Sequence, residues 1–304
     1  MTNGEFRAEA ARFGFERVYF LRPERFDLGD NRWGLVADAA AEFPFASSIA
    51  CLVYPYAPFT ADERIPAYYL ASNKAYRLMR DLRSRLAELG LRTEKAEIPA
   101  KLAFERAGVA AGLRNSLDSI PPYGSRVVLL FLAAEGIPPE EYGSAPHPPC
   151  AHCKKCAAAC PNGAIGENGL DLSRCMRYYM DSACRSDSIR DRQKTFIGCE
   201  ICQYACPLNA GLEAAEPDAG ARAAFDIRAL ISGDQKRARS LVGKNITGNG
   251  KLIAEAIAFA ARDRLIPKEE LLPLLDEAEG SPFEAVRDAV RYARSKLAAD
   301  QAED

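Results

Sequence analysis

The stretch CAHCKKCAAACPNGAI, residues 150–165, decides how the middle of this chain folds. Its cysteines stand at spacings of three, three and four residues and are followed by proline: Cys150, Cys153, Cys156, Cys160 and Pro161. Structural zinc sites usually take two separated pairs of cysteines. Three cysteines in close succession, with a fourth before a proline, are instead typical of chains that hold two [4Fe–4S] clusters. The stretch therefore predicts iron–sulfur clusters.

A second run, CEICQYACPLN at residues 199–209, has the same ending but lacks its first cysteine, because Phe196 stands there. Another thiol must complete the second cluster; Cys175 is the nearest candidate and Cys184 is the runner-up. Since the fourth cysteine of each run crosses to the other cluster, the predicted ligands form two sets. These are Cys150, Cys153, Cys156 and Cys206 for the first cluster, and Cys160, Cys175, Cys199 and Cys202 for the second. A pair of zinc sites is the alternative.

The composition is that of a globular protein that buries a substantial core. The 304 residues are 48% hydrophobic and 27% charged, with a formal net charge of −2. A near-neutral chain argues against binding nucleic acid over its whole surface. No window is apolar enough to span a bilayer, and the N-terminus lacks the apolar centre of a signal peptide. We therefore expect a cytoplasmic monomer, without membrane contact, whose ten cysteines stay reduced.

The region before the cysteines, residues 1–145, predicts an α/β domain. The segments 47–56 and 125–135 are short apolar runs typical of buried strands. Between them, residues 73–89 carry apolar side chains at helical spacing, which predicts a helix packed on a sheet. Its expected core residues are Ala75, Leu78, Met79, Leu82, Leu86 and Leu89. Cys51, within the first strand, is expected to be a small buried apolar residue.

The cysteine-rich part, residues 146–210, is expected to form a ferredoxin-like insert with the two clusters. The remaining residues, 211–304, read as short helices separated by Gly and Pro, which suggests stacked helical repeats. The predicted fold class is therefore α+β, with an α/β front domain, a two-[4Fe–4S] insert and an α-helical tail.

These motifs resemble one family, the epoxyqueuosine reductases. CAHCKKCAAACPNGAI, LDLSRCMRYYM and GCEICQYACPLN are similar to its cluster region, where Cys175 and Asn209 fit the cysteine between the runs and the Asn after the second. The segment 98–130 is similar as well. Its matching residues are Pro99, Ala107, Gly108, Arg114, Asn115, Tyr123, Gly124 and Ser125. The tail resembles a shortened form of the family's HEAT-like repeats.

The resemblance implies a cobalamin between the front domain and the clusters, and an oxidoreductase that removes the oxygen of an epoxide on a modified tRNA base. An external donor of the ferredoxin or flavodoxin type would supply the electrons. The residues that it implies for cofactor binding are Arg114, Asn115, Ser116, Tyr123, Gly124 and Ser125. The family's acidic proton donor falls at Ala96 here, so the neighbouring Glu97 is the candidate, and an ordinary surface glutamate is the alternative.

A tRNA substrate calls for basic residues that reach phosphates. Two groups qualify: Arg174, Arg177, Arg185, Arg190, Arg192 and Lys194, and Lys236, Arg237, Arg239, Lys244 and Lys251. They could equally form an ordinary solvated surface. Two other functions stay open: an electron carrier that reduces a partner's corrinoid and has no substrate of its own, and a structural cluster protein that binds nucleic acid.

Overall fold

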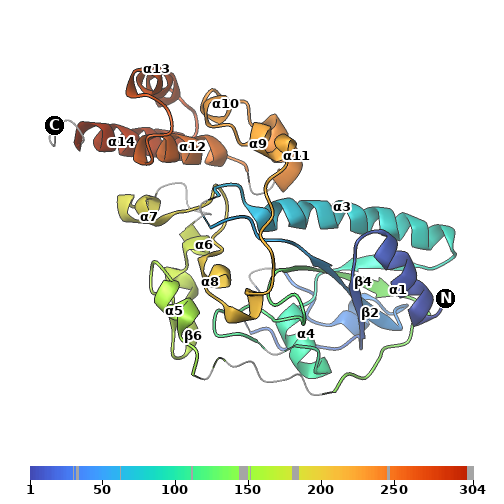
Figure 1. Cartoon of the computed structure of the whole chain (residues 1–304). Helices are drawn as coiled ribbons and strands as arrows, with labels where there is room; N and C mark the ends of the chain where they lie inside the picture. The colour runs from blue at the N-terminus through green and yellow to red at the C-terminus, as the bar shows by residue number, and fades with distance from the viewer. Residues whose placement is uncertain are drawn as a thin grey trace.

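Figure 1 shows the chain as a computed structural model. The structure describes residues 1–29, 31, 34–61, 63–110, 112–143, 150, 152–179, 185–244 and 247–299. Its three visible parts are a sheet flanked by helices, a segment of short elements beside it, and a group of helices at the C-terminal end.

The front of the chain is built on one antiparallel sheet with the strand order β1-β2-β4-β3. Its strands are β1 (Arg17–Leu21), β2 (Ser48–Pro55), β3 (Thr93–Ala96) and β4 (Val127–Ala134). The two strands predicted from sequence are thus confirmed as β2 and β4. They pair with each other along their whole length at the centre of the sheet. Both faces of β2 are buried, which explains why its sequence is continuously apolar.

Helices cover both faces of the sheet. The long helix α3 (Ala67–Glu88) packs on one face with α1 (Asn3–Arg12), and α2 (Ala39–Glu42) and α4 (Ala100–Ala107) pack on the other. Cys51 is fully buried in β2, as expected. Most predicted core positions of α3 are buried, but Leu89 is 43% exposed. That prediction was wrong because the helix ends there, with Leu89 as the C-cap residue, so the helical spacing no longer applies.

The cysteine-rich segment consists of short elements linked by turns. They are α5 (Lys155–Ala159), β5 (Ile165–Gly166), β6 (Gly169–Leu170), η1 (Leu172–Arg174), α6 (Met176–Tyr179), α7 (Asp187–Arg192), α8 (Ile201–Tyr204) and η2 (Pro207–Asn209). The helix α5 carries Cys156 and α8 carries Cys202, and these two helices pack on each other. This contact brings the two cysteine runs together.

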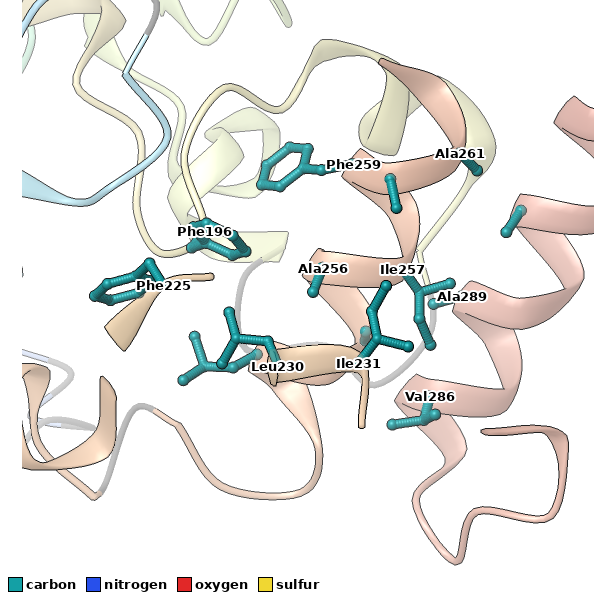
Figure 2. Close-up of a cluster of buried hydrophobic side chains, with 14 of the residues drawn as sticks. Phe196, Phe225, Leu230, Ile231, Ala256, Ile257, Phe259, Ala261, Val286 and Ala289 are labelled. Carbon is teal, nitrogen blue, oxygen red and sulfur yellow. The ribbon is translucent and has the colours of Figure 1, made fainter. Parts of the chain in front are cut away.

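The C-terminal part is helical. It contains α9 (Ala219–Ala224), α10 (Ile227–Ile231), α11 (Lys236–Val242), α12 (Lys251–Arg262), α13 (Lys268–Glu279) and α14 (Glu284–Ala299). Figure 2 shows its core, in which Phe196 from the cysteine-rich segment packs with Phe225 and Phe259. The tail also contacts the front domain, since Asn73 of α3 donates to the Ser240 and Leu241 carbonyls at the end of α11. Within the described residues, no helix is both long enough and apolar enough to cross a bilayer.

Candidate functional site

The seven cysteines of the two runs and Cys175 fall into two spatial groups. The first group lines a small cavity and consists of Cys150, Cys153, Cys156 and Cys206. Burial raises the pKa of Cys156 and of Cys206, and the other thiols of the same group act in the same direction. A cationic centre that binds between such thiols stabilises them as thiolates.

The second group lines a separate, larger cavity of about 420 Å³ and consists of Cys160, Cys175, Cys199 and Cys202. Burial raises the pKa of Cys199 to about 12 and that of Cys202 to about 11, and the neighbouring thiols contribute in both cases. The two groups contain the same cysteines as the two predicted ligand sets, and the assignment of these cysteines as cluster ligands stays a prediction. Cys184, the runner-up ligand, lies outside the described residues.

Small residues let the backbone approach the second group. The Ala164 N–H donates to Cys160 Sγ at 3.2 Å. Gly163 adopts the left-handed conformation that this turn requires, and Arg174 lies 3.1 Å from where its Cβ would be. Backbone N–H groups that point at thiolate sulfur stabilise the reduced form of a cluster.

The larger cavity lies between the front domain and the cysteine-rich segment. The front domain contributes Tyr68 and Tyr69 of α3, Lys101 of α4, and Val127 and Leu129 of β4. The loop 115–118 also lines it. The cysteine-rich segment lines the cavity with Leu170, Leu172, Met176 and the second cysteine group. A mostly apolar cavity with a few polar side chains is the usual form of a site for an organic ligand.

Three of the six residues implied for cofactor binding line this cavity: Asn115, Ser116 and Ser125. Asn115 also lines the small cavity, so it stands between the two cysteine groups. Its side chain is 5% exposed, and its amide nitrogen forms no hydrogen bond of good geometry with any described residue. The Asn115 side chain lies close enough to the Cys202 thiol to lower its pKa by hydrogen bonding, against the larger effect of burial.

The other three have different surroundings. Arg114 lines the small cavity and donates to the Cys150 carbonyl at 2.9 Å. Gly124 contacts the loop after Cys206, where Leu208 and Asn209 approach it. Tyr123 donates to the Glu16 carboxylate and lies away from both cysteine groups.

Glu97, the proton donor suggested by resemblance, is outside the larger cavity. Its side chain is 55% exposed and forms an ion pair with Lys95. These surroundings fit the alternative interpretation, in which Glu97 is an ordinary surface glutamate.

A buried ion pair beside the second group was not found from the sequence. Arg126 is 1% exposed and pairs with Glu200, the residue after Cys199. Glu200 also accepts from the Tyr68 backbone N–H at 3.1 Å. The pair thus connects β4, α3 and the second cysteine run. No sequence pattern predicts this ion pair, because its two residues come from distant segments of the chain.

A network of amides and a hydroxyl joins the same two segments. The Ser125 N–H donates to Asn209 Oδ1 at 2.8 Å, and Asn209 Nδ2 donates to the Gln203 carbonyl at 2.8 Å. Gln203 Nε2 in turn donates to the Ser125 carbonyl at 2.7 Å. The start of β4 is therefore fixed to the turn that carries Cys202 and Cys206.

Two of the basic residues suggested for nucleic acid are not at the surface. Arg185 and Arg190 are buried and pair with Glu255 and Asp288 of the tail. Their place in a phosphate-binding face was therefore wrongly predicted, because their partners lie far along the chain. Arg174, Arg192 and Lys194 are exposed, as are Lys236, Arg237 and Lys244 of the tail.

The cysteine-rich segment has known relatives. Residues 149–209 match the 4Fe-4S double cluster binding domain. The chain is 33% identical over 126 residues to the epoxyqueuosine reductase of Bacillus subtilis, which covers 39% of this chain and 31% of that protein. It is 25% identical over 224 residues to that of Listeria monocytogenes, covering 69% of this chain and 57% of that protein. The alignments thus span from just under a third to just over half of the length of these relatives.

Solved structures share the overall fold. An epoxyqueuosine reductase crystallised with an epoxyqueuosine-modified stem loop of tyrosine tRNA superimposes with a TM-score of 0.76 at 22% identity, covering 97% of this chain and 89% of that one. The Bacillus subtilis enzyme gives 0.75 at 21%, covering 97% and 90%. The predicted mixed fold with a cluster domain and the resemblance drawn from the motifs are confirmed. Residues 149–209 form a 4Fe–4S double cluster binding domain, within a chain that has the fold of the epoxyqueuosine reductases.

Proposed function

We propose that this protein is a reductase that carries electrons from two [4Fe–4S] clusters to a substrate in the 420 Å³ cavity. The observation that carries the proposal is the position of that cavity, which the front domain and the second cysteine group line together. The first cluster would be held by Cys150, Cys153, Cys156 and Cys206, and the second by Cys160, Cys175, Cys199 and Cys202. An electron carrier without its own substrate would not need a cavity beside its inner cluster.

We infer that cobalamin is the cofactor of this cavity. The support is the sequence resemblance together with the fit of the site: apolar walls from Val127 and Leu129, the neighbouring Cys175 and Cys199, and the buried Asn115 amide nitrogen, which has no acceptor of good geometry among the described residues. Bound cobalamin supplies a cobalt centre of low potential that can break a carbon–oxygen bond. The chain's own residues would exclude water, orient the ligand through Asn115 and Ser116, and deliver electrons through the second group.

The proposed substrate is an epoxide on a modified tRNA base. Removal of the epoxide oxygen breaks two C–O bonds, forms one C=C bond and consumes two electrons and two protons, so that the oxygen leaves as water. The relatives are named epoxyqueuosine reductases, and one was solved with an epoxyqueuosine-modified stem loop. Exposed basic residues such as Arg174, Arg192 and Lys194 would contact its phosphates.

Electrons would enter through the first cluster and leave through the second. The second group borders the cavity, whereas the first lies beside the exposed side chains of Lys154 and Lys155. A basic surface near the first cluster suits an acidic donor of the ferredoxin or flavodoxin type. We further propose that the protein is a cytoplasmic monomer and that its helical tail is a shortened HEAT-like array, in which α12 packs on α10, α13 and α14.

Anaerobic reconstitution with cob(II)alamin tests the proposed function. We expect one equivalent to bind and change its visible and EPR spectra, and the reduced protein to convert an epoxide-bearing tRNA stem loop. Binding without turnover would point to another substrate. If the spectra do not change at stoichiometric cofactor, the electron-carrier function replaces this one. Salt-dependent tRNA binding without any redox turnover would favour the structural cluster protein.

Iron counts test the ligand sets. Cys175→Ala should lower the iron content from about eight to about four per chain, because one cluster loses a ligand, and Cys184→Ala should leave it unchanged. The opposite result would make Cys184, and not Cys175, the ligand of the second cluster. Zinc in place of iron and sulfide in protein prepared without oxygen would refute both clusters.

A further inference from the structure

The larger cavity contains two carboxylates, and only one of them is committed to an ion pair. Glu200 is paired with Arg126 and accepts from the Tyr68 backbone. Asp118 also lines the cavity, and among the described residues it forms no ion pair within 4 Å. A carboxyl group in an apolar site without a bound cation tends to keep its proton at neutral pH. Such a group can donate that proton to a reacting ligand.

The loop that carries Asp118 is fixed at both ends. Gly112 and Asp118 form an isolated antiparallel bridge, and the Leu113 N–H donates to the Leu117 carbonyl at 2.7 Å. Within this loop Ser116 has a φ of 63°, a conformation that is unfavourable for any residue with a Cβ. Non-glycine residues in this region are concentrated at functional sites. The loop thus holds Asn115, Ser116 and Asp118 at the cavity in a defined arrangement.

Lys101 is the cation that acts on the charge of the Asp118 carboxyl. It lies on α4, lines the same cavity, and its ammonium donates to Ser116 Oγ. Burial lowers the pKa of Lys101 and raises that of Asp118, and the charge of each residue opposes the shift in the other. Lys101 therefore fixes the loop and offsets part of the rise in the pKa of Asp118, without forming a direct ion pair with it.

From this geometry we propose that Asp118 donates one of the two protons consumed in the cavity, with Lys101 as its positioning residue. The inference rests on the proposed function. The donated proton goes to the epoxide oxygen as its C–O bond breaks, and the electrons come from the external donor through the clusters. Solvent then returns a proton to the Asp118 carboxylate. Asp118 thereby takes the role that resemblance assigned to the region of Glu97, whose carboxylate is paired with Lys95 at the surface.

Single-turnover kinetics of the reduced holoprotein test this proposal. We expect Asp118→Asn to slow conversion of the epoxide-bearing stem loop by about 100-fold or more, the usual contribution of a general acid. Cofactor binding and cluster EPR spectra should stay unchanged. Glu105→Gln, an exposed carboxylate on the same helix as Lys101, is the matched control and should convert substrate at the wild-type rate. If Glu97→Gln loses activity while Asp118→Asn keeps it, Asp118 is not the donor.

The pH profile separates a proton donor from a structural residue. The wild-type rate should fall as pH rises through the pKa of Asp118, since the donor must be protonated. Lys101→Met should move this fall to higher pH, because it removes a cation that favours the ionised carboxyl, and Lys101→Arg should leave it in place. If Asp118 had only a structural role, neither Lys101 variant would shift the pH at which the rate falls.

Difference infrared spectra, wild type minus Asp118→Asn, report the protonation of this carboxyl without substrate. A titration in the ordinary range of aspartate would overturn the proposal even if the protein reduces its substrate. If wild-type protein with bound cofactor converts no substrate while the pKa of Asp118 is raised, the proposed epoxide reduction is refuted. The protonated carboxyl in the cavity is then still supported.

Discussion

Gly124 shows how one residue can control a metal site that it does not ligate. Its φ is +56°, and a Cβ at this position would lie 2.1 Å from Asn209 Oδ1 and 2.6 Å from the Leu208 carbonyl oxygen. Both partners belong to the turn after Cys206. The absence of a side chain therefore lets β4 approach the turn that positions a proposed ligand of the first cluster.

Gly124→Ala should push this turn away. We expect it to destabilise the protein by about 1–3 kcal/mol through overpacking, in addition to about 1–2 kcal/mol for the left-handed backbone. Iron should fall from about eight toward about four per chain, because Cys206 is displaced. The control is Gly136→Ala, since Gly136 has a φ of +66° but no atom within 4 Å of its Cβ position. That variant should keep its iron, and equal iron loss in both would refute the steric argument.

Asn115 allows a test of the clusters themselves. Its buried side chain lines both cysteine cavities; the amide oxygen accepts from the Leu117 N–H at 3.3 Å, and the amide nitrogen has no acceptor of good geometry among the described residues. A donor near cluster sulfur favours the more negative, reduced state. Replacement by Leu should therefore make the midpoint potential of at least one cluster more negative, by about 60 mV if the hydrogen bond contributes about 1.4 kcal/mol.

EPR-monitored redox titration measures this shift. Asn115→Asp should shift the potential further in the same direction, since it adds a negative charge beside the clusters. Asn73→Leu removes an amide that donates to the Ser240 and Leu241 carbonyls of the tail, and it should leave both potentials unchanged. Unchanged potentials in Asn115→Leu would show that this amide does not reach the clusters.

At the scale of elements, the long helix and the central strands could be predicted because their burial is local and periodic. The apolar run at β2 and the spacing of Ala75, Met79 and Leu82 on α3 carry this information in neighbouring residues. The cysteine spacing works in the same way, since the cluster dictates it. Leu89 was wrongly placed in the core because periodicity does not show where a helix ends.

The polar residues around the cavity could not be predicted, because each obtains its role from a partner far along the chain. Arg126 is an ordinary cation until β4 meets Glu200, and Asp118 is an ordinary loop residue until α4 brings Lys101 beside it. The same holds for Arg185, which the sequence suggested as a phosphate contact and which is buried against Glu255.

The contact between α12 and the segment before the second cysteine run depends on buried charge. Glu255 on α12 is 2% exposed, pairs with Arg185 and accepts from Gln193 Nε2 at 2.6 Å. Glu255→Gln should lower the free energy of unfolding by about 3–5 kcal/mol, because it removes the carboxylate that pairs with the buried Arg185 guanidinium.

Anaerobic urea denaturation measures this loss. Glu279→Gln is the matched control, since Glu279 pairs with Arg294 but is 65% exposed, and its effect should stay below about 1 kcal/mol. The double variant Arg185→Met/Glu255→Leu should recover most of the stability, because neither charge is then buried. A small effect in Glu255→Gln itself would refute the stabilising role of this charge pair.

At the scale of the whole molecule, three parts meet around the cysteines. The front sheet and α3 close one side of the larger cavity, and the tail is joined to the cysteine-rich segment by the pairs Arg185–Glu255 and Arg190–Asp288. Boundaries at residues 145 and 210 remain predictions. The arrangement nevertheless implies a direction for electrons, because the second cysteine group faces the cavity and the first does not.

Removal of the first cluster tests that direction. Cys153→Ser should leave about four irons per chain, all in the second cluster. Dithionite, which is small enough to diffuse into the cavity, should still reduce this cluster. A reduced flavodoxin should reduce it much more slowly than in wild type, since a protein donor would reach it only through the missing relay. Stopped-flow absorbance with each reductant gives both rates. If flavodoxin reduces the Cys153→Ser variant as fast as the wild type, electrons enter directly at the second cluster, and the first has another role.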